Sequence, residues 1–265
     1  MPELPEVQTV INDLFDCVIS KKIDNLVELR KGTIINNTDN NSMNYGIIRT
    51  IERKGKYILI KTNHKKFLIH LRMTGKLIYC EKLDKNIKHN RAYFVFSDKT
   101  YLIFNDVRTF GKIEIYNEND EISIFKRLGI DALSSEMTVR YLTEMFKNRK
   151  APIKNLLLSQ EIISGIGNIY ANEILFHARI DPRKTPKEFD KKILKKLTIK
   201  IKDILKKAIK HNGTTISDYR RVDDKTGSFQ EFLKVYQKNY CDCGNKITKI
   251  KQAGRSTFYC SKCQK

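Results

Sequence analysis

The sequence predicts an α+β protein with antiparallel strands behind an N-terminal helix, a helical region after them and a small hairpin at the end. Three observations support this prediction. β-rich segments separated by turn residues fill residues 45–117. Apolar residues at helical spacing dominate 151–210. Four of the six cysteines lie within 241–265, which marks a separate tail.

The first residues, MPELPEV, place two prolines and two acids at the start of the chain. Chain ends are often poorly ordered, so these residues taken alone favour a frayed terminus. Residues 7–18 then carry apolar side chains at helical spacing, which predicts a helix directly after this opening.

The β-rich segments read as a meander of antiparallel strands that forms a sandwich or a barrel. A second region begins near residue 151 with a short helix, a glycine-bearing turn and another helix. A long lysine-coated helix over 187–210 has one apolar stripe, and we interpret its charged face as solvated surface. Residues 219–230 are polar and turn-rich, as in a loop.

Charge is the strongest signal in the composition. Lys and Arg total 51 against 30 Asp and Glu, a formal net charge of +21. Such a chain repels itself unless a polyanion neutralises it, and nucleic acid is the natural partner, with membrane surfaces or ribosomal RNA as alternatives. A lysine-rich proteome would give the same composition. Because the sequence has neither a secretion signal nor an apolar run of about 20 residues, we expect a cytoplasmic protein.

The cysteine-rich tail predicts a zinc ribbon. Cys241 and Cys243 form one close pair, and Cys260 and Cys263 form the other, with a strand–turn–strand segment between them. Zn²⁺ takes four thiolates tetrahedrally, which makes such a metal structural. Disulfides are the alternative, and a reducing compartment disfavours them. The first pair is C-x-C rather than the usual C-x₂-C, so its geometry stays open.

Seven motifs then recur in a fixed order: MPELPEV at the start, RKGKY at 53–57, HLRMTG at 70–75, NDVRTFG at 105–111, GIGNIYANE at 165–173, NGTT at 212–215 and GRSTFYCSKC at 254–263. Together they make the whole chain resemble bacterial formamidopyrimidine-DNA glycosylases, the base-excision enzymes for oxidised purines such as 8-oxoguanine and formamidopyrimidines.

The resemblance implies an antiparallel β-sandwich flanked by helices, then a helix–two-turns–helix domain with a zinc-ribbon β-hairpin. The expected domains are a catalytic sandwich at 1–133, a helical DNA-binding domain at 134–230 and a zinc finger at 231–265. A loop near 216–228 would close over the lesion. The resemblance further implies a protein that binds damaged double-stranded DNA, associates with the nucleoid through it and holds one structural Zn²⁺, with no catalytic metal or nucleotide. The sequence offers no dimerisation signature, and one active site per chain suits a monomer.

The same resemblance gives the opening a catalytic role and replaces the frayed terminus with an ordered one. Once Met1 is removed, Pro2 presents a secondary amine, and α-amino groups with a pKa of about 8 are partly neutral at cellular pH. The amine would displace the base and form an iminium, with Glu3 as general acid. Lys56 matches the lysine assigned to β-elimination, although an exposed strand lysine is its alternative. Arg255 matches the arginine associated with δ-elimination, and we favour a grip on phosphate for it.

The DNA contacts implied by the resemblance fall into two groups. Met73, Arg108 and Phe110 match the triad that fills the space left by an extruded base, with Arg108 on the orphaned cytosine. Phosphate contacts are expected from His89, Arg149, Lys150, Lys154, Asn168, Tyr236 and Arg255.

The sequence departs from the family pattern at Gln8, where Glu is common, and at Asn212, where Gly is usual. Two other functions stay open: a non-catalytic zinc-ribbon protein that binds nucleic acid, and an endonuclease VIII-like glycosylase for oxidised pyrimidines. The Pro2–Glu3 pair with Lys56 favours catalysis. Leu4, where endonuclease VIII usually has Gly, favours the purine enzyme.

Overall fold

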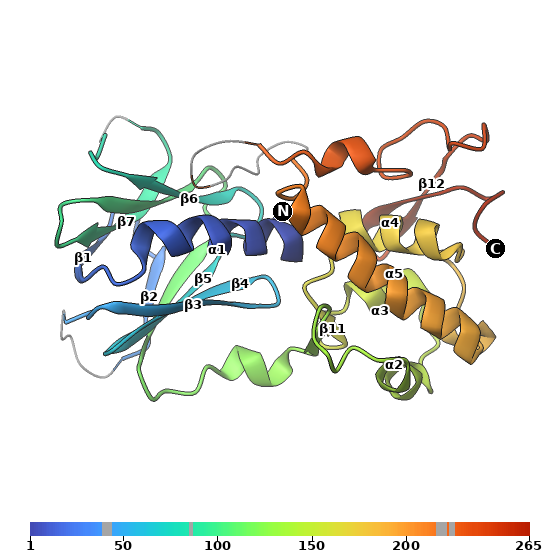
Figure 1. The fold of residues 1–265 in the computed structure, drawn as a ribbon, viewed down its shortest axis with the longest axis horizontal. Helices are drawn as coiled ribbons and strands as arrows, with labels where there is room; N and C mark the ends of the chain where they lie inside the picture. The colour runs from blue at the N-terminus through green and yellow to red at the C-terminus, as the bar shows by residue number, and fades with distance from the viewer. Residues whose placement is uncertain (39–43, 85–86, 216–221, 223–225) are drawn as a thin grey trace. The chain divides into compact units, whose positions relative to one another are not determined.

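The computed structural model describes residues 1–38, 44–84, 87–215, 222 and 226–265. These form two compact units, Met1–Phe125 with His211–Ser228, and Lys126–Lys210 with Phe229–Lys265 (Figure 1). Most of the expected lesion-closing loop near 216–228 lies outside the described residues. Among the described residues, no helix combines the length and hydropathy that crossing a bilayer requires.

The first unit contains one helix, α1 (Leu4–Val18), and two β-sheets. Its strands are β1 (Ile23–Glu28), β2 (Ile34–Asn36), β3 (Ile48–Lys54), β4 (Tyr57–Thr62), β5 (Lys65–His70), β6 (Gly75–Cys80), β7 (Asn90–Phe96), β8 (Tyr101–Asp106) and β9 (Lys112–Asn117). One sheet has the order β1-β7-β8-β6 and the other β2-β9-β5-β4-β3. All neighbouring pairs are antiparallel except β2 and β9, which run parallel. The predicted β-sandwich is therefore confirmed, and the barrel alternative is not.

Alternation along the strands explains how this unit is packed. Ile58 and Phe67 point from the five-stranded sheet into a core shared with the four-stranded sheet and α1. Leu59 and Leu68, one residue further along, pack on the opposite face against Ile122. Because successive side chains of a strand point to opposite faces, these two layers account for the nearly continuous apolar runs of β4 and β5.

Helix α1 begins immediately at the chain start. Glu3 is the N-cap residue, and Glu6 completes a capping box, which satisfies N–H groups that a helix start leaves without partners. Val7, Val10 and Leu14 lie on the buried face of the helix. The frayed terminus favoured by the first residues alone is therefore wrong.

The second unit is mainly helical, as expected. It contains α2 (Val139–Phe146), α3 (Ile153–Leu158), α4 (Asn168–Ala178), α5 (Lys191–Lys210), the short parallel pair β10 (Ile130–Asp131) and β11 (Ile163–Ser164), and the hairpin of β12 (Thr248–Gln252) and β13 (Arg255–Tyr259). The chain also forms 3-10 turns at η1 (Ser123–Arg127), η2 (Pro186–Glu188) and η3 (Phe229–Phe232). Helix α5 packs against α2 and α4, and α4 packs against β13.

The long helix predicted over 187–210 begins later, at Lys191. Residues Pro186–Glu188 form a 3-10 turn instead, and the Asp190 carboxylate accepts the N–H of Ile193 at 2.7 Å. This is the hydrogen bond of an Asp at a helix N-terminus, and it fixes where the helix begins.

Phe67 offers a test of the shared core. Its ring is buried and meets the ring of Phe94 edge-on, with the centroids 5.2 Å apart. Phe67→Ala should lower the free energy of unfolding by about 3–5 kcal/mol because it leaves a cavity. The exposed Phe15 gives a matched control, since Phe15→Ala should change it by less than about 1 kcal/mol. Urea denaturation measures both, and equal losses would contradict the packing described here.

Candidate functional site

The start of α1 fixes the predicted amine-bearing end of the chain. Pro2 and Glu3 are both buried. Glu6 accepts the N–H of Glu3 at 2.8 Å through one oxygen and the N–H of Thr214 at 2.7 Å through the other. A single buried carboxylate therefore ties the helix start to the NGTT turn within the first unit, and charge-assisted bonds of this kind are strong.

The NGTT turn explains one departure from the family pattern. Asn212 and Gly213 both adopt left-handed backbone conformations, with φ of 57° and 76°. A Cβ at Gly213 would come within 2.8 Å of the Glu6 carboxylate. Asn is one of the few residues with a side chain that tolerate this conformation, so it can replace Gly at position 212 without a large cost.

Gln8 also keeps a role at this end of α1. Its carbonyl oxygen accepts from Arg53 Nε at 3.0 Å, and its amide donates to Asn12 at 2.9 Å. Arg53 belongs to the RKGKY motif, and its guanidinium donates to the Gly55 carbonyl at 3.1 Å. Gln in place of Glu therefore preserves the hydrogen bond to this motif while removing a charge.

Lys56 lies in the two-residue turn between β3 and β4, beside Gly55 at φ 58°, rather than on a strand. It is only 6% exposed, so the alternative of an exposed surface lysine is wrong. Burial removes water from an ammonium group, which is the environment in which lysines take part in chemistry.

His70 is a residue of the site that sequence reasoning did not single out, although it begins the HLRMTG motif. Its Nδ1 accepts the N–H of Arg72 at 2.9 Å, and its ring meets Tyr57 edge-on at 4.5 Å. Burial, with the cations Arg72 and Lys56, lowers the pKa of His70 to about 3. The imidazole is therefore neutral near neutral pH and does not repel Lys56.

Met73, Arg108 and Phe110 lie on two loops of the first unit, one between β5 and β6 and the other between β8 and β9. Met73 is 40% exposed and Phe110 is 52% exposed, which is unusual for large apolar side chains. The Arg108 guanidinium lies over the Phe110 ring, 5.2 Å from its centroid. Core packing does not account for these apolar side chains, and their exposure suits insertion into a partner. His89 is exposed before β7.

The second unit holds the other predicted DNA contacts. Arg149 and Lys150 are exposed between α2 and α3, and Arg255 is exposed at the start of β13. Tyr236 packs its ring on Phe258 with the centroids 5.2 Å apart. Its N–H, with those of the two preceding residues, donates to the buried Glu173 carboxylate.

Lys154 is fully buried, unlike a simple phosphate-binding lysine on the surface. Its ammonium donates to the Ser256 carbonyl at 3.0 Å and to the Thr257 hydroxyl at 2.7 Å. Asn168 donates to the same Ser256 carbonyl at 3.1 Å. Both side chains thereby hold the strand that begins at Arg255 against α3 and α4.

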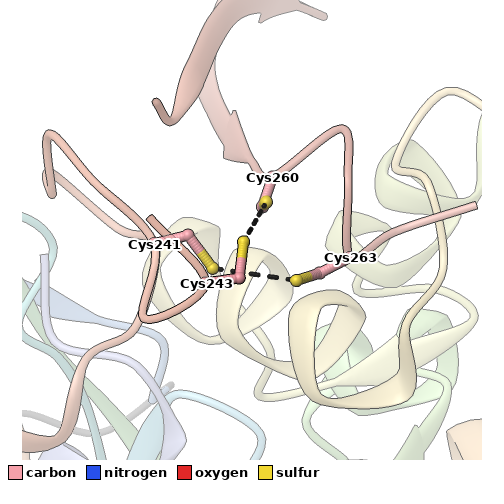
Figure 2. A group of neighbouring side chains, drawn as sticks. All are labelled: Cys241, Cys243, Cys260 and Cys263. Carbon is pink, nitrogen blue, oxygen red and sulfur yellow. Dashed lines mark hydrogen bonds between the residues drawn. The ribbon is translucent and has the colours of Figure 1, made fainter. Parts of the chain in front are cut away.

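The tail brings the four predicted metal ligands together. The sulfur atoms of Cys241, Cys243, Cys260 and Cys263 all lie within 4.8 Å of one another (Figure 2). All six cysteines of the chain are free thiols, so the disulfide alternative is not supported. Four thiolates from two turns are the donor set that structural zinc takes, and the tail is the site of one structural Zn²⁺.

The shortened C-x-C turn closes through local hydrogen bonds. Gly244, at φ 79°, donates to the Cys241 carbonyl at 2.9 Å, and the Cys241 N–H donates to the Asn245 carbonyl at 2.9 Å. The backbone N–H of Asn245 is the main cause that lowers the pKa of Cys243 to about 7. This backbone donor favours the thiolate form of Cys243, whereas burial raises the pKa of Cys241.

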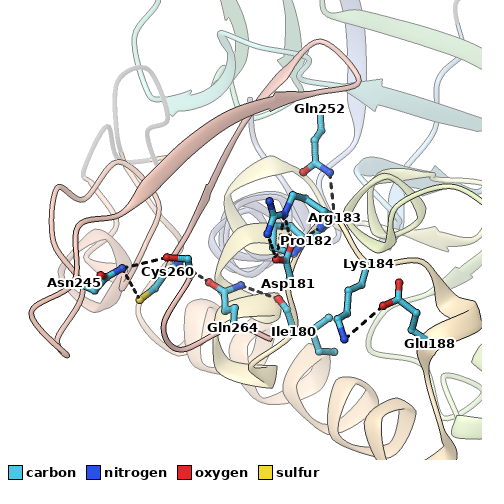
Figure 3. Close-up of polar contacts among 11 residues, drawn as sticks. Ile180, Asp181, Pro182, Arg183, Lys184, Glu188, Asn245, Gln252, Cys260 and Gln264 are labelled. Carbon is cyan, nitrogen blue, oxygen red and sulfur yellow. Dashed lines mark hydrogen bonds and ion pairs between the residues drawn. The ribbon is translucent and has the colours of Figure 1, made fainter.

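The second cysteine turn is attached to the end of α4 (Figure 3). The Asn245 amide donates to the sulfur of Cys260 at 3.7 Å. Gln264, which is buried, accepts the N–H of Cys260 at 2.9 Å and donates to the Ile180 carbonyl at 2.8 Å. The metal turn and the helix end therefore share one bridging amide.

Comparison with known proteins shows which family shares these features. Three family models match: Formamidopyrimidine-DNA glycosylase N-terminal domain over residues 1–113, Formamidopyrimidine-DNA glycosylase H2TH domain over 128–220, and Zinc finger found in FPG and IleRS over 242–265. The zinc-finger match starts one residue after Cys241, at the shortened turn.

Similar proteins cover the whole chain. The formamidopyrimidine-DNA glycosylase of Wolbachia pipientis subsp. Culex pipiens is 42% identical, with 100% of both chains covered. That of Mycoplasma genitalium is 38% identical, with 100% of this chain and 96% of the relative covered. Among solved structures, the Lactococcus lactis Fpg in complex with abasic-site DNA is 31% identical with a TM-score of 0.90, and 99% of both chains are covered.

The burial of Lys154 leads to a stability prediction. Lys154→Ala leaves a cavity and removes a donor to the Ser256 carbonyl and to the buried Thr257 hydroxyl, so it should lower the free energy of unfolding by about 1–3 kcal/mol. Lys150→Ala, four residues earlier and exposed, should cost less than about 0.5 kcal/mol. Guanidinium denaturation measures both values, and a Lys154 loss no larger than the Lys150 loss would contradict the described contacts.

The pKa of His70 predicts a pH dependence of stability. The value in the fold lies well below 6.5, the value expected for an unperturbed histidine, so protonation favours the unfolded chain. The stabilisation is present above pH 6.5 and is lost as the pH falls toward 3. His70→Asn should flatten this part of the profile, whereas a change at the exposed His64 should not. Thermal unfolding at a series of pH values tests this, and parallel profiles for wild type and His70→Asn would refute it.

Proposed function

Because the chain belongs to the formamidopyrimidine-DNA glycosylase family, we propose that its buried N-terminal proline is the nucleophile of a bifunctional DNA glycosylase and lyase. The enzyme acts in base-excision repair on damaged double-stranded DNA, where it removes oxidised purines and cuts the strand. The non-catalytic zinc-ribbon protein and the oxidised-pyrimidine enzyme are not favoured, since the curated relatives are named as formamidopyrimidine-DNA glycosylases.

One observation carries the residue assignment: Pro2 and Glu3 are both buried at the start of α1, where the Glu6 carboxylate accepts the N–H of Glu3. Without Met1, the lone pair of the Pro2 nitrogen attacks C1′ of the damaged nucleotide and the glycosidic bond breaks. The base leaves with the electrons of that bond and takes up the proton that the Pro2 nitrogen loses. Glu3 donates a proton to the ring oxygen as the sugar opens, and an iminium forms between Pro2 and C1′. An amine fixed by the fold avoids the entropic cost of ordering a flexible chain end at each turnover.

The iminium makes the C2′ proton acidic. Loss of this proton expels the 3′ phosphate, and a second elimination expels the 5′ phosphate. We assign Lys56 to the first of these steps, supported by its burial in the first unit beside the neutral His70. Arg255 is exposed at the start of β13, a strand that Lys154 and Asn168 hold, and supplies a guanidinium for a phosphate.

The exposed Met73 and Phe110, with Arg108, would fill the space left by the extruded base. Phosphate contacts come from His89, Arg149, Lys150, Asn168, Tyr236 and Arg255. For Lys154 we propose an indirect role, in which its buried ammonium holds the strand that bears Arg255.

We propose a division into domains at 1–133, 134–230 and 231–265, and a monomer that works at chromosomal DNA in the nucleoid. The single-chain complexes of relatives with DNA support the monomer. The zinc ion stabilises the tail and takes no part in the chemical steps.

Borohydride trapping tests the nucleophile. Protein lacking Met1 is mixed with a duplex that carries one 8-oxoguanine opposite cytosine, and reduction should convert the iminium into a stable adduct at Pro2. Mass spectrometry of the N-terminal peptide locates the adduct. Protein that retains Met1 should give at least about 100-fold less adduct because its Pro2 nitrogen is an amide.

Pro5→Ala is the matched control, since it changes the neighbouring proline of the same opening and should leave trapping within about threefold of wild type. Tight DNA binding without adduct or strand scission, in protein shown to lack Met1, would instead favour the non-catalytic protein.

A further inference from the structure

We propose that Asp106 is a positioning residue for base extrusion: it sets the two loops that carry Met73, Arg108 and Phe110 into one arrangement. The proposal rests on the proposed function, because it assigns these three side chains to the extrusion step. Both loops and Asp106 lie in the first unit.

Asp106 is completely buried at the end of β8, and its carboxylate contacts both loops. One oxygen accepts the Thr74 hydroxyl and the Arg108 N–H, the latter at 3.2 Å. The other oxygen accepts the Gly111 N–H at 2.8 Å. Thr74 follows Met73 directly, and Arg108 and Gly111 bracket Phe110, so one carboxylate fixes the flanks of all three side chains.

The loops need such a partner because their backbones are strained. Arg72 and Thr109 adopt left-handed conformations, with φ of 54° and 63°, which side chains of this kind rarely occupy. The loops also expose the large apolar side chains of Met73 and Phe110 to solvent. Neither belongs to the buried core cluster of the first unit, so core packing does not stabilise their positions. Hydrogen bonds from fixed N–H groups to a buried carboxylate can maintain this arrangement.

Gly111 shows how closely the second loop is held. A Cβ at this position would collide with the Phe104 ring and would lie 3.0 Å from the His70 carbonyl. The loop therefore returns to the sheet at a fixed point, which Asp106 reaches through the Gly111 N–H.

The main chain of Asp106 extends the arrangement to a third predicted DNA contact. Its N–H donates to the His89 carbonyl at 3.0 Å, and its carbonyl accepts Arg91 Nε at 2.7 Å. His89 also has a left-handed backbone, with φ of 72°. Meanwhile Asp106 binds Arg108 through the backbone N–H, and the Arg108 guanidinium lies over Phe110 instead.

The test compares two substrates with the full-length enzyme. Excision from a duplex with 8-oxoguanine opposite cytosine requires the base to be extruded. Cleavage at a preformed abasic site in the same duplex requires no base to leave the stack. Asp106→Asn should slow excision by about 10- to 100-fold under single-turnover conditions, as expected for misplaced groups, and should slow abasic-site cleavage by less than about threefold.

Thr74→Val is the milder variant, since it removes the hydroxyl that bridges the carboxylate and the Arg108 N–H. It should change the two rates in the same direction as Asp106→Asn. Its effect should largely disappear when Met73 is already alanine, because interacting residues are not additive. Asp16→Asn, an exposed acid on α1, is the matched control and should change neither rate.

A fluorescent 2-aminopurine next to the lesion reports extrusion directly in stopped-flow experiments. Asp106→Asn should slow the rise of this signal by the same factor as excision. Equal losses on both substrates, matched by a loss of thermal stability, would reduce Asp106 to a purely structural role, and an unchanged excision rate would refute the proposal. Wild-type enzyme that is inactive on both substrates would contradict the proposed function instead.

Discussion

The functional parts of both units depend on one kind of interaction, the hydrogen bond from a backbone N–H group to a buried carboxylate. Glu6 accepts from the helix start and from the NGTT turn, Asp106 from the loop after β8, and Glu173 from three successive residues of 234–236. A desolvated carboxylate must have donors, and backbone donors are fixed in direction once the chain has folded. Each acid therefore orders the segment that surrounds it.

Local sequence patterns predicted the features that depend on residues close together in the chain. The β-rich segments separated by turn residues predicted the strands of the sandwich, and the cysteine spacing predicted the metal site. That the first residues are well ordered could not be predicted from the local sequence. Part of the reason is that the Glu6 carboxylate accepts the N–H of Thr214, which lies on a turn far away in the chain. The burial of Lys154 was equally hidden, since its acceptors Ser256 and Thr257 lie about a hundred positions later in the chain. The parallel pairing of β2 with β9 could not be predicted either, because the two strands are far apart in the chain and no single turn joins them.

The three departures from the family pattern are accommodated by different means. Gln8 keeps the hydrogen bond to Arg53 through its amide oxygen. Asn212 tolerates the left-handed backbone that Gly would otherwise occupy. The C-x-C turn closes around Gly244 and still places its sulfur atoms with those of the second turn. Each solution uses atoms within a few residues or on one partner strand, so none of the three departures requires a rearrangement of the fold.

The buried ammonium of Lys154 has a consequence for how such a chain can evolve or be engineered. Because it bonds two groups of β13 from α3, the helix and the hairpin carry complementary halves of one contact. A tail grafted from a relative would have to present the same carbonyl and hydroxyl at that spot, or leave a cation stranded without water. Helix and hairpin should therefore be inherited and exchanged together as one cassette, so that Lys154 and its two acceptors always come from the same parent.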